Sequence, residues 1–397
     1  MIATMFRKSI LTVIMLVSAL LSPVAFGAGR WTGTWATAQE APGNAGDMPA
    51  SSLAGRSLRQ VIHVSLGGEK LRLQLSNEFS NQPLEIKSVY IADAAGGSEI
   101  APSTAKYLTF GKKKSVVIPA GEALYSDPLD FPLDSLQLLS ITVNYGNSVP
   151  EIPTTHRGSR TNSYIMKGVS SPKKPFVVEE TLPHWYNIAK IEVLSDAPCV
   201  AVIGDSLTDG RGSTTDAQDR WTDALAEALD GKVGVLNLGI GGNALLAGGL
   251  SQPGLVRFDR DVLAQQGITH VIVLEGTNDI GGTQSGYEQL AARLVDGYKE
   301  IARKARDAGC KVFIGTITPT FGSDYYSYWH DAVRHQVNDW IRSTDGVTDG
   351  FIDFDQAVKD PSDSRRLLPE YSSDWLHLNP EGYKVMGKTA ATCLTAN

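Results

Sequence analysis

The pattern of apolar and polar residues changes about halfway along this chain of 397 residues. From Trp31 to about Val193, short stretches alternate with a period of two and are separated by clusters of Gly, Pro, Asn and Ser. This pattern, without convincing helical repeats, predicts short β-strands packed as a β-sandwich or jelly roll. Ile62–Leu66, Gly67-Gly68 and Leu71–Leu75 predict a β-hairpin with one solvent-exposed face. Further strands are expected at 86–92, 115–118, 138–145 and 188–193.

After Ser195-Asp196-Ala197-Pro198, continuous apolar runs alternate with helical repeats. Such runs are typical of strands that are buried on both faces. Five of them joined by helices predict a five-stranded parallel sheet in an α/β/α three-layer domain. The strand candidates are Cys199–Ile203, Val233–Leu238, His270–Leu274, Val312–Ile317 and Phe351–Phe354. The clearest helical repeats are Leu290, Leu294, Tyr298, Ile301 and Ala305, and Trp329, Val333, Val337 and Ile341.

The first 27 residues form a separate unit with the features of a secretory signal peptide. Arg7 and Lys8 precede the apolar stretch Ile10–Leu21, and Ala25-Phe26-Gly27 suits a signal peptidase. We therefore expect a signal peptide at 1–27, a β-sandwich-like domain at 28–196 and the three-layer α/β/α domain at 197–397. The expected location is secreted or periplasmic, with no stable membrane insertion after cleavage.

Charge and cysteine content restrict the function further. The formal net charge is −7, and loss of two positive charges with the signal peptide makes it −9. An acidic chain without a basic patch is a poor nucleic-acid binder. Cys199, Cys310 and Cys393 allow at most one intramolecular disulfide. A Cys199–Cys393 pair and three free thiols are both open, and the sequence carries no signal for an oligomeric state.

Residues suited to acyl transfer follow the carboxyl ends of the predicted parallel strands, where ligands bind in such sheets. Ser206 follows the first strand, Gly242 the second and Asn278 the third, while Asp374 and His377 precede a final helix. A serine hydroxyl needs an imidazole to take its proton and a carboxylate to orient that imidazole. The backbone N–H groups of Ser206 and Gly242 and the Asn278 side-chain amide are suited to bind the oxyanion.

These four segments, in this order, resemble the GDSL or SGNH hydrolase family over residues 199–395. The stretch GDSLTDGRGSTTD at 204–216 is most similar to a subfamily of arylesterases and acylhydrolases found with xylan-degrading genes of rumen bacteria. The resemblance implies Ser206 as nucleophile, Gly242 and Asn278 as oxyanion donors, Asp374 and His377 completing the triad, and an N-terminal β domain. It also implies no metal or organic cofactor. The expected substrate is a small-molecule or polysaccharide acyl ester, with acetyl groups on plant polysaccharide favoured.

Three alternative functions accompany this reading. The first is a lipid acylhydrolase of the lysophospholipase type, and the second is a non-catalytic carbohydrate-binding protein. The third is a dinucleotide-binding enzyme, because Gly239-x-Gly241-x-x-Ala244 follows a strand and Glu275 ends the next one. The distance in sequence to Glu275 exceeds the ~20 residues of that motif, and no clean helix opens at Gly242.

Other polar and aromatic residues are interpreted as structural. Charged residues at strand ends commonly serve as hydrogen-bonding struts, and the remaining histidines lack metal-ligand spacing. Tyr325, Tyr326, Tyr328 and Trp329 either wall the substrate pocket or pack in the core. The expected struts are Asp209, Glu275 and Asp355, the expected loop cap is Asp279, the structural histidines include His270, His330 and His335, and the expected sandwich-core residues are Trp31, Trp35 and Trp185.

Overall fold

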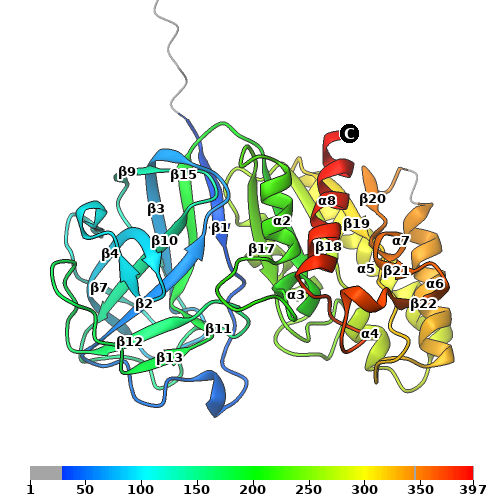
Figure 1. Ribbon diagram of the computed structural model, residues 1–397, viewed down its shortest axis with the longest axis horizontal. Coiled ribbons are helices and arrows are strands. Elements are labelled where there is room, and N and C mark those ends of the chain that lie inside the picture. The colour runs from blue at the N-terminus through cyan, green and yellow to red at the C-terminus, as the bar shows by residue number, and fades with distance from the viewer. Residues whose placement is uncertain (1–28, 344–345, 397) are drawn as a thin grey trace, which may run out of the picture.

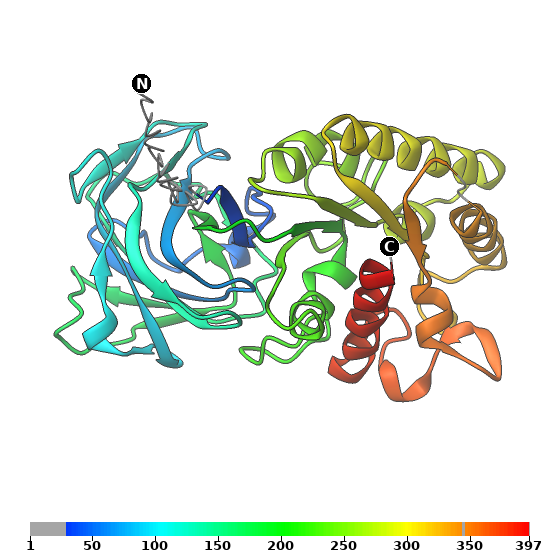
Figure 2. The ribbon, with the colours of Figure 1, turned by 90° about the horizontal axis from the view of Figure 1, so that it is seen from above.

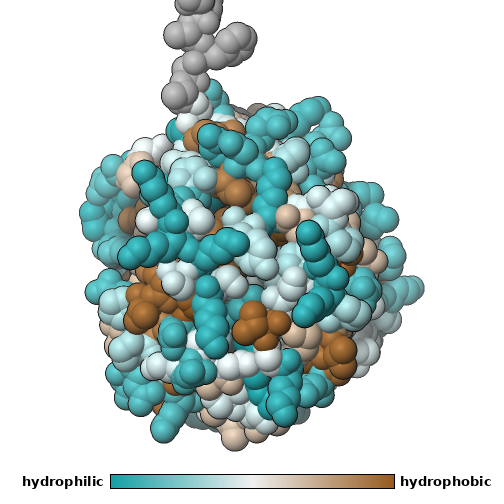
Figure 3. Space-filling model, turned by 90° about the vertical axis from the view of Figure 1, so that its left-hand side faces the viewer, coloured by the Kyte–Doolittle hydropathy of each residue, from teal (hydrophilic) through white to brown (hydrophobic). Residues whose placement is uncertain are grey.

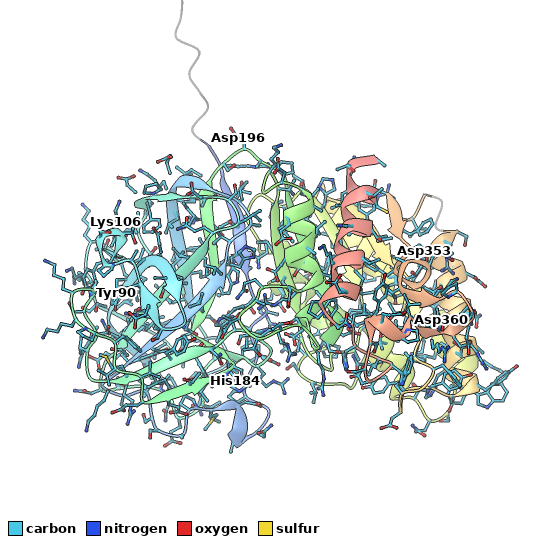
Figure 4. All side chains as sticks on the ribbon, in the orientation of Figure 1. Tyr90, Lys106, His184, Asp196, Asp353 and Asp360 are labelled. Atoms are coloured by element: carbon cyan, nitrogen blue, oxygen red, sulfur yellow. The ribbon has the colours of Figure 1, made fainter. Side chains whose placement is uncertain are left out.

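The computed structural model describes residues 29–343 and 346–396, so the predicted signal peptide at 1–27 lies outside the described part. A β-rich N-terminal half lies beside an α/β C-terminal half (Figure 1). The chain passes from one half to the other near Asp196, at the top of the view in Figure 4. The outer face of the N-terminal half is mostly hydrophilic, with small separate apolar spots (Figure 3).

Two antiparallel sheets form most of the N-terminal half. The strands of the first sheet, in spatial order, are β1 (Trp31–Ala36), β15 (Ile188–Leu194), β3 (Gly68–Ser76) and β8 (Ala123–Tyr125), with β9 (Leu129–Leu133) also paired to β3. Those of the second are β13 (Glu180–Leu182), β12 (Ser163–Lys167), β2 (Arg56–His63), β10 (Leu138–Tyr145), β4 (Leu84–Gly96) and β5 (Glu99–Ile100), with β6 (Lys106–Tyr107) and β7 (Val116–Ile118) paired to β4. A short ladder joins β11 (Thr155–His156) to β14 (Trp185–Tyr186).

The predicted hairpin between β2 and β3 is wrong. β2 pairs with β10 and β12, whereas β3 pairs with β15, β8 and β9 in the other sheet. Thr34 of β1 holds the connection, because its carbonyl accepts from the Ser65 N–H (3.0 Å) and its Oγ1 from the Leu66 N–H (2.7 Å). These bonds turn the chain from one sheet to the other, so both strands face a shared interior.

The apolar faces of the two sheets enclose the first hydrophobic core. Trp35 and Trp185 lie in this core with their rings edge to face, 5.1 Å apart. Trp31, expected there too, is only partly buried and packs under the guanidinium of Arg72. Burial of the alternating apolar positions of strands such as β3 drives this packing.

The C-terminal half is an α/β domain, as the pattern predicts. Among the described residues, its larger sheet has the spatial order β17-β16-β18-β19-β20, with parallel pairing throughout. The fifth strand is shorter than predicted, because Asp353 accepts from the Gln356 N–H and caps a helix that starts at Phe354. The strands are β16 (Cys199–Gly204), β17 (Gly234–Gly239), β18 (His270–Leu274), β19 (Lys311–Gly315) and β20 (Gly350–Ile352).

Helices cover both faces of this sheet (Figure 2). One face carries α3 (Gly254–Phe258), α5 (Tyr287–Asp307) and α6 (Tyr328–Arg342). The other carries α2 (Trp221–Ala228), α7 (Phe354–Val358) and α8 (Pro380–Ala396). Two short helices at the strand ends are α1 (Ser206–Asp209) and α4 (Thr277–Gly281), and a small ladder joins β21 (Lys359–Asp360) to β22 (Asp363–Leu367).

The three cysteines are free thiols, so the alternative of a Cys199–Cys393 disulfide is wrong. Cys199 is fully buried in the core on one face of the parallel sheet, where its Sγ lies 3.5 Å from the Gly33 carbonyl. Cys393 lies on α8 and packs into the core on the opposite face. The sheet itself therefore separates the two sulfur atoms.

The two halves pack directly on each other through β1 and β17. Ala36 and Ala38, which belong to the N-terminal half by sequence, are buried in a core of the C-terminal half. A Cβ at Gly234 of β17 would collide with the Gly33 carbonyl of β1, so glycine permits this close approach. The Gly33 N–H also donates to the Gln266 carbonyl (3.0 Å). The junction is thus a packed interface between the halves.

Candidate active site

The order of the parallel strands brings three loops to one edge of the sheet. β16 lies between β17 and β18, and its last residue, Gly204, pairs in register with Gly239 and Leu274. The three strands therefore end at the same level. From β16 the chain moves outward to β17 and then returns across β16 to β18. Ligands bind beyond the carboxyl ends of strands at such a reversal.

Ser206 is the first residue of helix α1, directly beyond β16. Asp205 precedes it and caps the helix, because its Oδ1 accepts from the Leu207 N–H (2.9 Å). Gly204 allows the sharp change from strand to helix, since a Cβ there would collide with the Thr208 side chain. The helix ends after one turn at Gly210, whose φ of 96° favours glycine. Ser206 is thereby held at the edge of the sheet.

Ser206, His377 and Asp374 form one chain of hydrogen bonds. Ser206 Oγ lies 2.9 Å from His377 Nε2, and His377 Nδ1 lies 2.8 Å from Asp374 Oδ2. A carboxylate at Nδ1 favours the tautomer with its proton on Nδ1, so Nε2 is free to accept the proton of the serine hydroxyl. This is the arrangement that a nucleophilic serine requires.

The spacing of three residues between Asp374 and His377 has a local structural cause. Asp374 Oδ1 accepts from the backbone N–H groups of Leu376 (3.0 Å) and His377 (2.8 Å), which closes a tight turn. Trp375 within the turn has a φ of 61°. Ser372 closes the segment by donating its hydroxyl to the His377 carbonyl (2.7 Å). One Asp374 oxygen thus fixes the backbone of His377 while the other orients its ring.

Burial and charge set the protonation states of the pair. Burial lowers the pKa of His377 below its usual 6.5, the Asp374 carboxylate opposes this, and the positive charges of Arg211 and Arg160 lower it further. Burial alone would raise the pKa of Asp374, but hydrogen bonds from His377 and Leu376 outweigh it and lower the pKa to about 2. Near neutral pH the imidazole is therefore neutral and the carboxylate ionised, as a general base and its partner need to be.

Gly242 and Asn278 face the same space as Ser206. Gly242 has a φ of 73°, and a Cβ there would come within 2.9 Å of the Leu250 side chain. The Asn278 Oδ1 accepts from the Tyr325 hydroxyl (2.9 Å), and Nδ2 donates to the Asn243 carbonyl (2.7 Å). Both ends of the Asn278 amide are therefore held, and Nδ2 also makes a long hydrogen bond to Asp205 Oδ2 (3.4 Å).

A pocket of about 320 Å³ surrounds Ser206 and lies between the two halves of the molecule, and we call it the interdomain pocket. Asp374 lies behind His377 and does not line it. The N-terminal half contributes to the lining, although no local pattern in the sequence predicts this. In Figure 4, His184 lies at the lower edge of the N-terminal half. The lining residues are Glu40, Asp47, Arg157, Gly158, Arg160, His184, Ser206, Asp209, Arg211, Gly241, Gly242, Leu250, Asn278, Tyr325, Leu376 and His377.

Asp209, at the end of the helix that carries Ser206, joins the two halves. It is buried, with one carboxylate oxygen 3.0 Å from His156 Nε2 and the other paired with the Arg160 guanidinium. Both partners come from the N-terminal half, and a Cβ at Gly158 would collide with the carboxylate. Burial raises the pKa of Asp209, but the positive charge of Arg160 and the bond from His156 lower it overall. Asp209, predicted as a hydrogen-bonding strut, therefore links the two domains.

The other acidic residues at the strand ends are structural. Asp279 accepts from the Leu245 and Leu246 N–H groups (2.8 and 2.9 Å), and Arg334 and Arg342 bind Asp355. Glu275 is buried against Arg257, 3.3 Å away, so it does not face open space as a ribose-binding acid would. This removes the support for the dinucleotide-binding alternative.

The aromatic group after β19 divides between the pocket and the surface. Tyr325 lines the interdomain pocket, whereas Tyr328 and Trp329 are 74% and 58% exposed. His330 is held by the Tyr325 and Thr283 carbonyls, which fits its predicted structural role. Among the described residues, no three His, Cys, Asp or Glu side chains come together in a way that could hold a metal ion.

The C-terminal half is thus an α/β domain with a Ser-His-Asp hydrogen-bond chain at the carboxyl edge of its sheet. Residues 202–385 match the model of the GDSL-like Lipase/Acylhydrolase family. The protein is a carboxylic ester hydrolase. No observation supports the alternative of a non-catalytic carbohydrate-binding protein over an ester hydrolase. No curated protein matches the sequence.

Several solved structures are similar to about half of the chain. One is an aryl esterase from M. Smegmatis, with 18% identity and a TM-score of 0.41 over 50% of this chain and 99% of that one. A carbohydrate acetylesterase from Sinorhizobium meliloti has 16% identity and a TM-score of 0.40 over 50% and 99%. A GDSL-like lipase from Bacteroides thetaiotaomicron has 18% identity and a TM-score of 0.39 over 50% and 88%.

Replacement of Asp209 by Asn tests its role between the domains. Asn keeps the size but leaves Arg160, whose side chain is only 28% exposed, without its counter-charge, so we expect a loss of about 3 kcal/mol in the free energy of unfolding. We also expect kcat for phenyl acetate to fall at least about tenfold, because helix α1 and Ser206 lose their support. Urea denaturation and initial rates measure the two effects.

The matched control is Asp230→Asn, which removes an exposed ion pair with Lys232 and should change neither quantity. A variant Asp209→Asn with the stability and kcat of the unmodified protein would contradict a positioning role for this residue.

Proposed function

We propose that this protein is an exported serine esterase that hydrolyses short-chain acyl esters through an acyl-enzyme, with acetylated carbohydrate as the favoured substrate. The observation that carries the proposal is the hydrogen-bond chain from Ser206 through His377 to Asp374, whose first two members line a pocket large enough for a small ester. The resemblance of residues 204–216 to arylesterases found with xylan-degrading genes supports the carbohydrate part of the proposal.

In the proposed mechanism, His377 Nε2 takes the hydroxyl proton as Ser206 Oγ attacks the ester carbonyl. The resulting oxyanion accepts from the Ser206 and Gly242 N–H groups and from the Asn278 amide proton that otherwise makes the long bond to Asp205 Oδ2. His377 then gives its proton to the leaving alcohol, and the acyl group stays on Ser206. Water, deprotonated by His377, attacks this acyl-enzyme, and the acid is released while Ser206 regains its proton.

The walls of the interdomain pocket favour a small acyl group over a fatty acyl chain. Its aliphatic lining consists of Leu250 and Leu376, whereas six of its lining side chains carry charge at neutral pH. Each methylene of a long chain gains about 0.8 kcal/mol only if it is transferred to apolar surroundings. A polar pocket with few aliphatic side chains offers little of that gain, which argues against the lipid acylhydrolase alternative.

Hydrolysis of a panel of esters tests the mechanism and the acyl preference together. We expect kcat/KM to be highest for 4-nitrophenyl acetate and to fall as the acyl chain lengthens through butyrate to octanoate. The variant Ser206→Ala should lose about 10³-fold or more in kcat/KM, because the nucleophile is gone. Ser285→Ala, an exposed serine of the same domain, is the matched control.

Two results would contradict this reading. Undiminished turnover by Ser206→Ala would remove Ser206 as nucleophile, and a kcat/KM that rises toward octanoate would favour lipid substrates. Release of acetate from acetylated xylan, measured beside the panel, tests the carbohydrate part.

The left-handed conformation of Gly242 provides a test of the oxyanion site. Gly242→Ala would strain the backbone and press on Leu250, so its N–H would leave the position that an oxyanion needs. We expect kcat to fall about 10²-fold with little change in KM. Gly248→Ala is the matched control, because Gly248 lies in the same loop with a φ of 76° and open space around it. Equal kcat values for the two variants would exclude Gly242 from the oxyanion site.

Export is proposed from residues 1–27, whose basic start, apolar stretch and small residues suit a signal peptide. Within the described residues, no helix is both long and apolar enough to cross a membrane. We expect full-length protein made in a bacterium to be recovered outside the cytoplasm with Ala28 at its N-terminus, as measured by fractionation and mass spectrometry. Chains lacking 1–27 should stay in the cytoplasm. Cytoplasmic protein that keeps residues 1–27 would contradict export.

A further inference from the structure

We propose that the alcohol side of the interdomain pocket is an anion-accepting subsite centred on Arg211, and that the preferred esters carry a carboxylate on their alcohol part. This inference rests on the proposed esterase function and adds a substrate class to it. It follows from the position of three arginines in the lining of the pocket, from the bonding of each one, and from the bonding of the acidic residues beside them.

Arg211 and Arg160 lie where the leaving alcohol must be. Both line the interdomain pocket, and the positive charge of each acts on the ring of His377. Arg211 also acts on the Tyr325 hydroxyl, which binds Asn278. His377 delivers a proton to the leaving alcohol, so groups beside its ring face the alcohol part of the ester.

Of the three arginines that line the pocket, Arg211 is the one without a carboxylate partner among the described residues. It is exposed, and neither an ion pair nor a side-chain hydrogen bond is found for it within residues 29–343 and 346–396. Arg160 instead pairs with Asp209, and Arg157 pairs with Glu40 at 2.6 Å. A guanidinium presents five N–H donors in a fixed fork that matches a carboxylate.

Each acidic residue of the pocket already accepts hydrogen bonds within the protein, Asp47 through one of its two oxygens. Glu40 accepts from the backbone and side chain of Arg157 and from the Ser251 hydroxyl. Asp47 Oδ2 accepts from two backbone N–H groups, and both oxygens of Asp209 have partners. The hydrogen-bonding groups of the pocket that remain free are therefore mainly donors. One unmatched guanidinium calls for a ligand with one negative charge, which a carboxylate supplies.

The test compares two acetate esters that differ in one charge. 4-Acetoxybenzoate carries a carboxylate on its alcohol part, and its methyl ester is neutral with nearly the same shape. We expect Arg211→Gln to lower the ratio of kcat/KM for the charged ester to that for the neutral ester by about tenfold, mainly through a higher KM for the charged ester. The ratio cancels any effect of the variant that both esters share.

Two further variants and one condition sharpen the measurement. Arg211→Lys keeps the charge but loses the fork, so its ratio should lie between those of the unmodified protein and Arg211→Gln. Arg303→Gln, at an exposed arginine on α5, is the matched control and should leave the ratio unchanged. In the unmodified protein the ratio should fall as ionic strength rises, because salt screens an exposed charge.

The subsite is overturned if Ser206-dependent hydrolysis is present but the ratio is the same in the unmodified protein and Arg211→Gln. A ratio in the unmodified protein that is independent of salt also overturns it. Both results leave the esterase proposal intact. If neither ester is hydrolysed in a Ser206-dependent way, the proposed function itself fails, so the two failures are distinguishable.

Discussion

Parallel pairing of β16 with β17 on one side and β18 on the other is the constraint on which the site depends. It ends three strands at one level, so the loops that follow them share one edge of the sheet. Ser206, Gly242 and Asn278 are far apart in the chain, yet each lies only a few residues beyond one of these ends. The fourth segment, with Asp374 and His377, arrives from the C-terminus because helix α8 packs on the same face of the sheet as α2.

The N-terminal half completes the site. It supplies six of the sixteen residues that line the interdomain pocket. Through His156 and Arg160 it also holds Asp209, on the helix that carries Ser206. Buried charges of this kind are stable only with their partners, so the position of helix α1 depends on the docking of both halves. The β domain is therefore one wall of the pocket.

Charge within the pocket is distributed unevenly despite equal numbers of arginines and carboxylates in the lining. Asp209 and Glu40 are engaged in interactions that fix the structure, while Arg211 is an exposed lining residue of the pocket. The same arginine contributes to the low pKa of His377, which keeps the imidazole neutral. The proposed recognition of an anionic alcohol part and the protonation state of the proposed base therefore involve the same exposed cation.

The sequence by itself determined the elements with strong local patterns. The apolar runs locate the strands of the parallel sheet, with β16 and β18 close to their predicted bounds, and the repeats locate α5 and α6. The predicted parallel direction of the strands also predicts a shared edge for the residues that follow them, because the carboxyl ends of parallel strands lie at the same edge of the sheet. The turn that links Asp374 to His377 is local too, since its hydrogen bonds span only three residues.

Only the tertiary structure decided the contacts that have no local signal. The period of two in β2 and β3 predicts strands but does not say which strand each one pairs with, and hydrogen bonds to Thr34 placed them in different sheets. Likewise, nothing in the stretch from His156 to Arg160 indicates that it meets Asp209. That contact depends on how two folded surfaces fit together. Local periodicity indicates which residues are buried and how each strand or helix runs. Docking of the two halves depends on the shape and charge of surfaces that are assembled from distant segments.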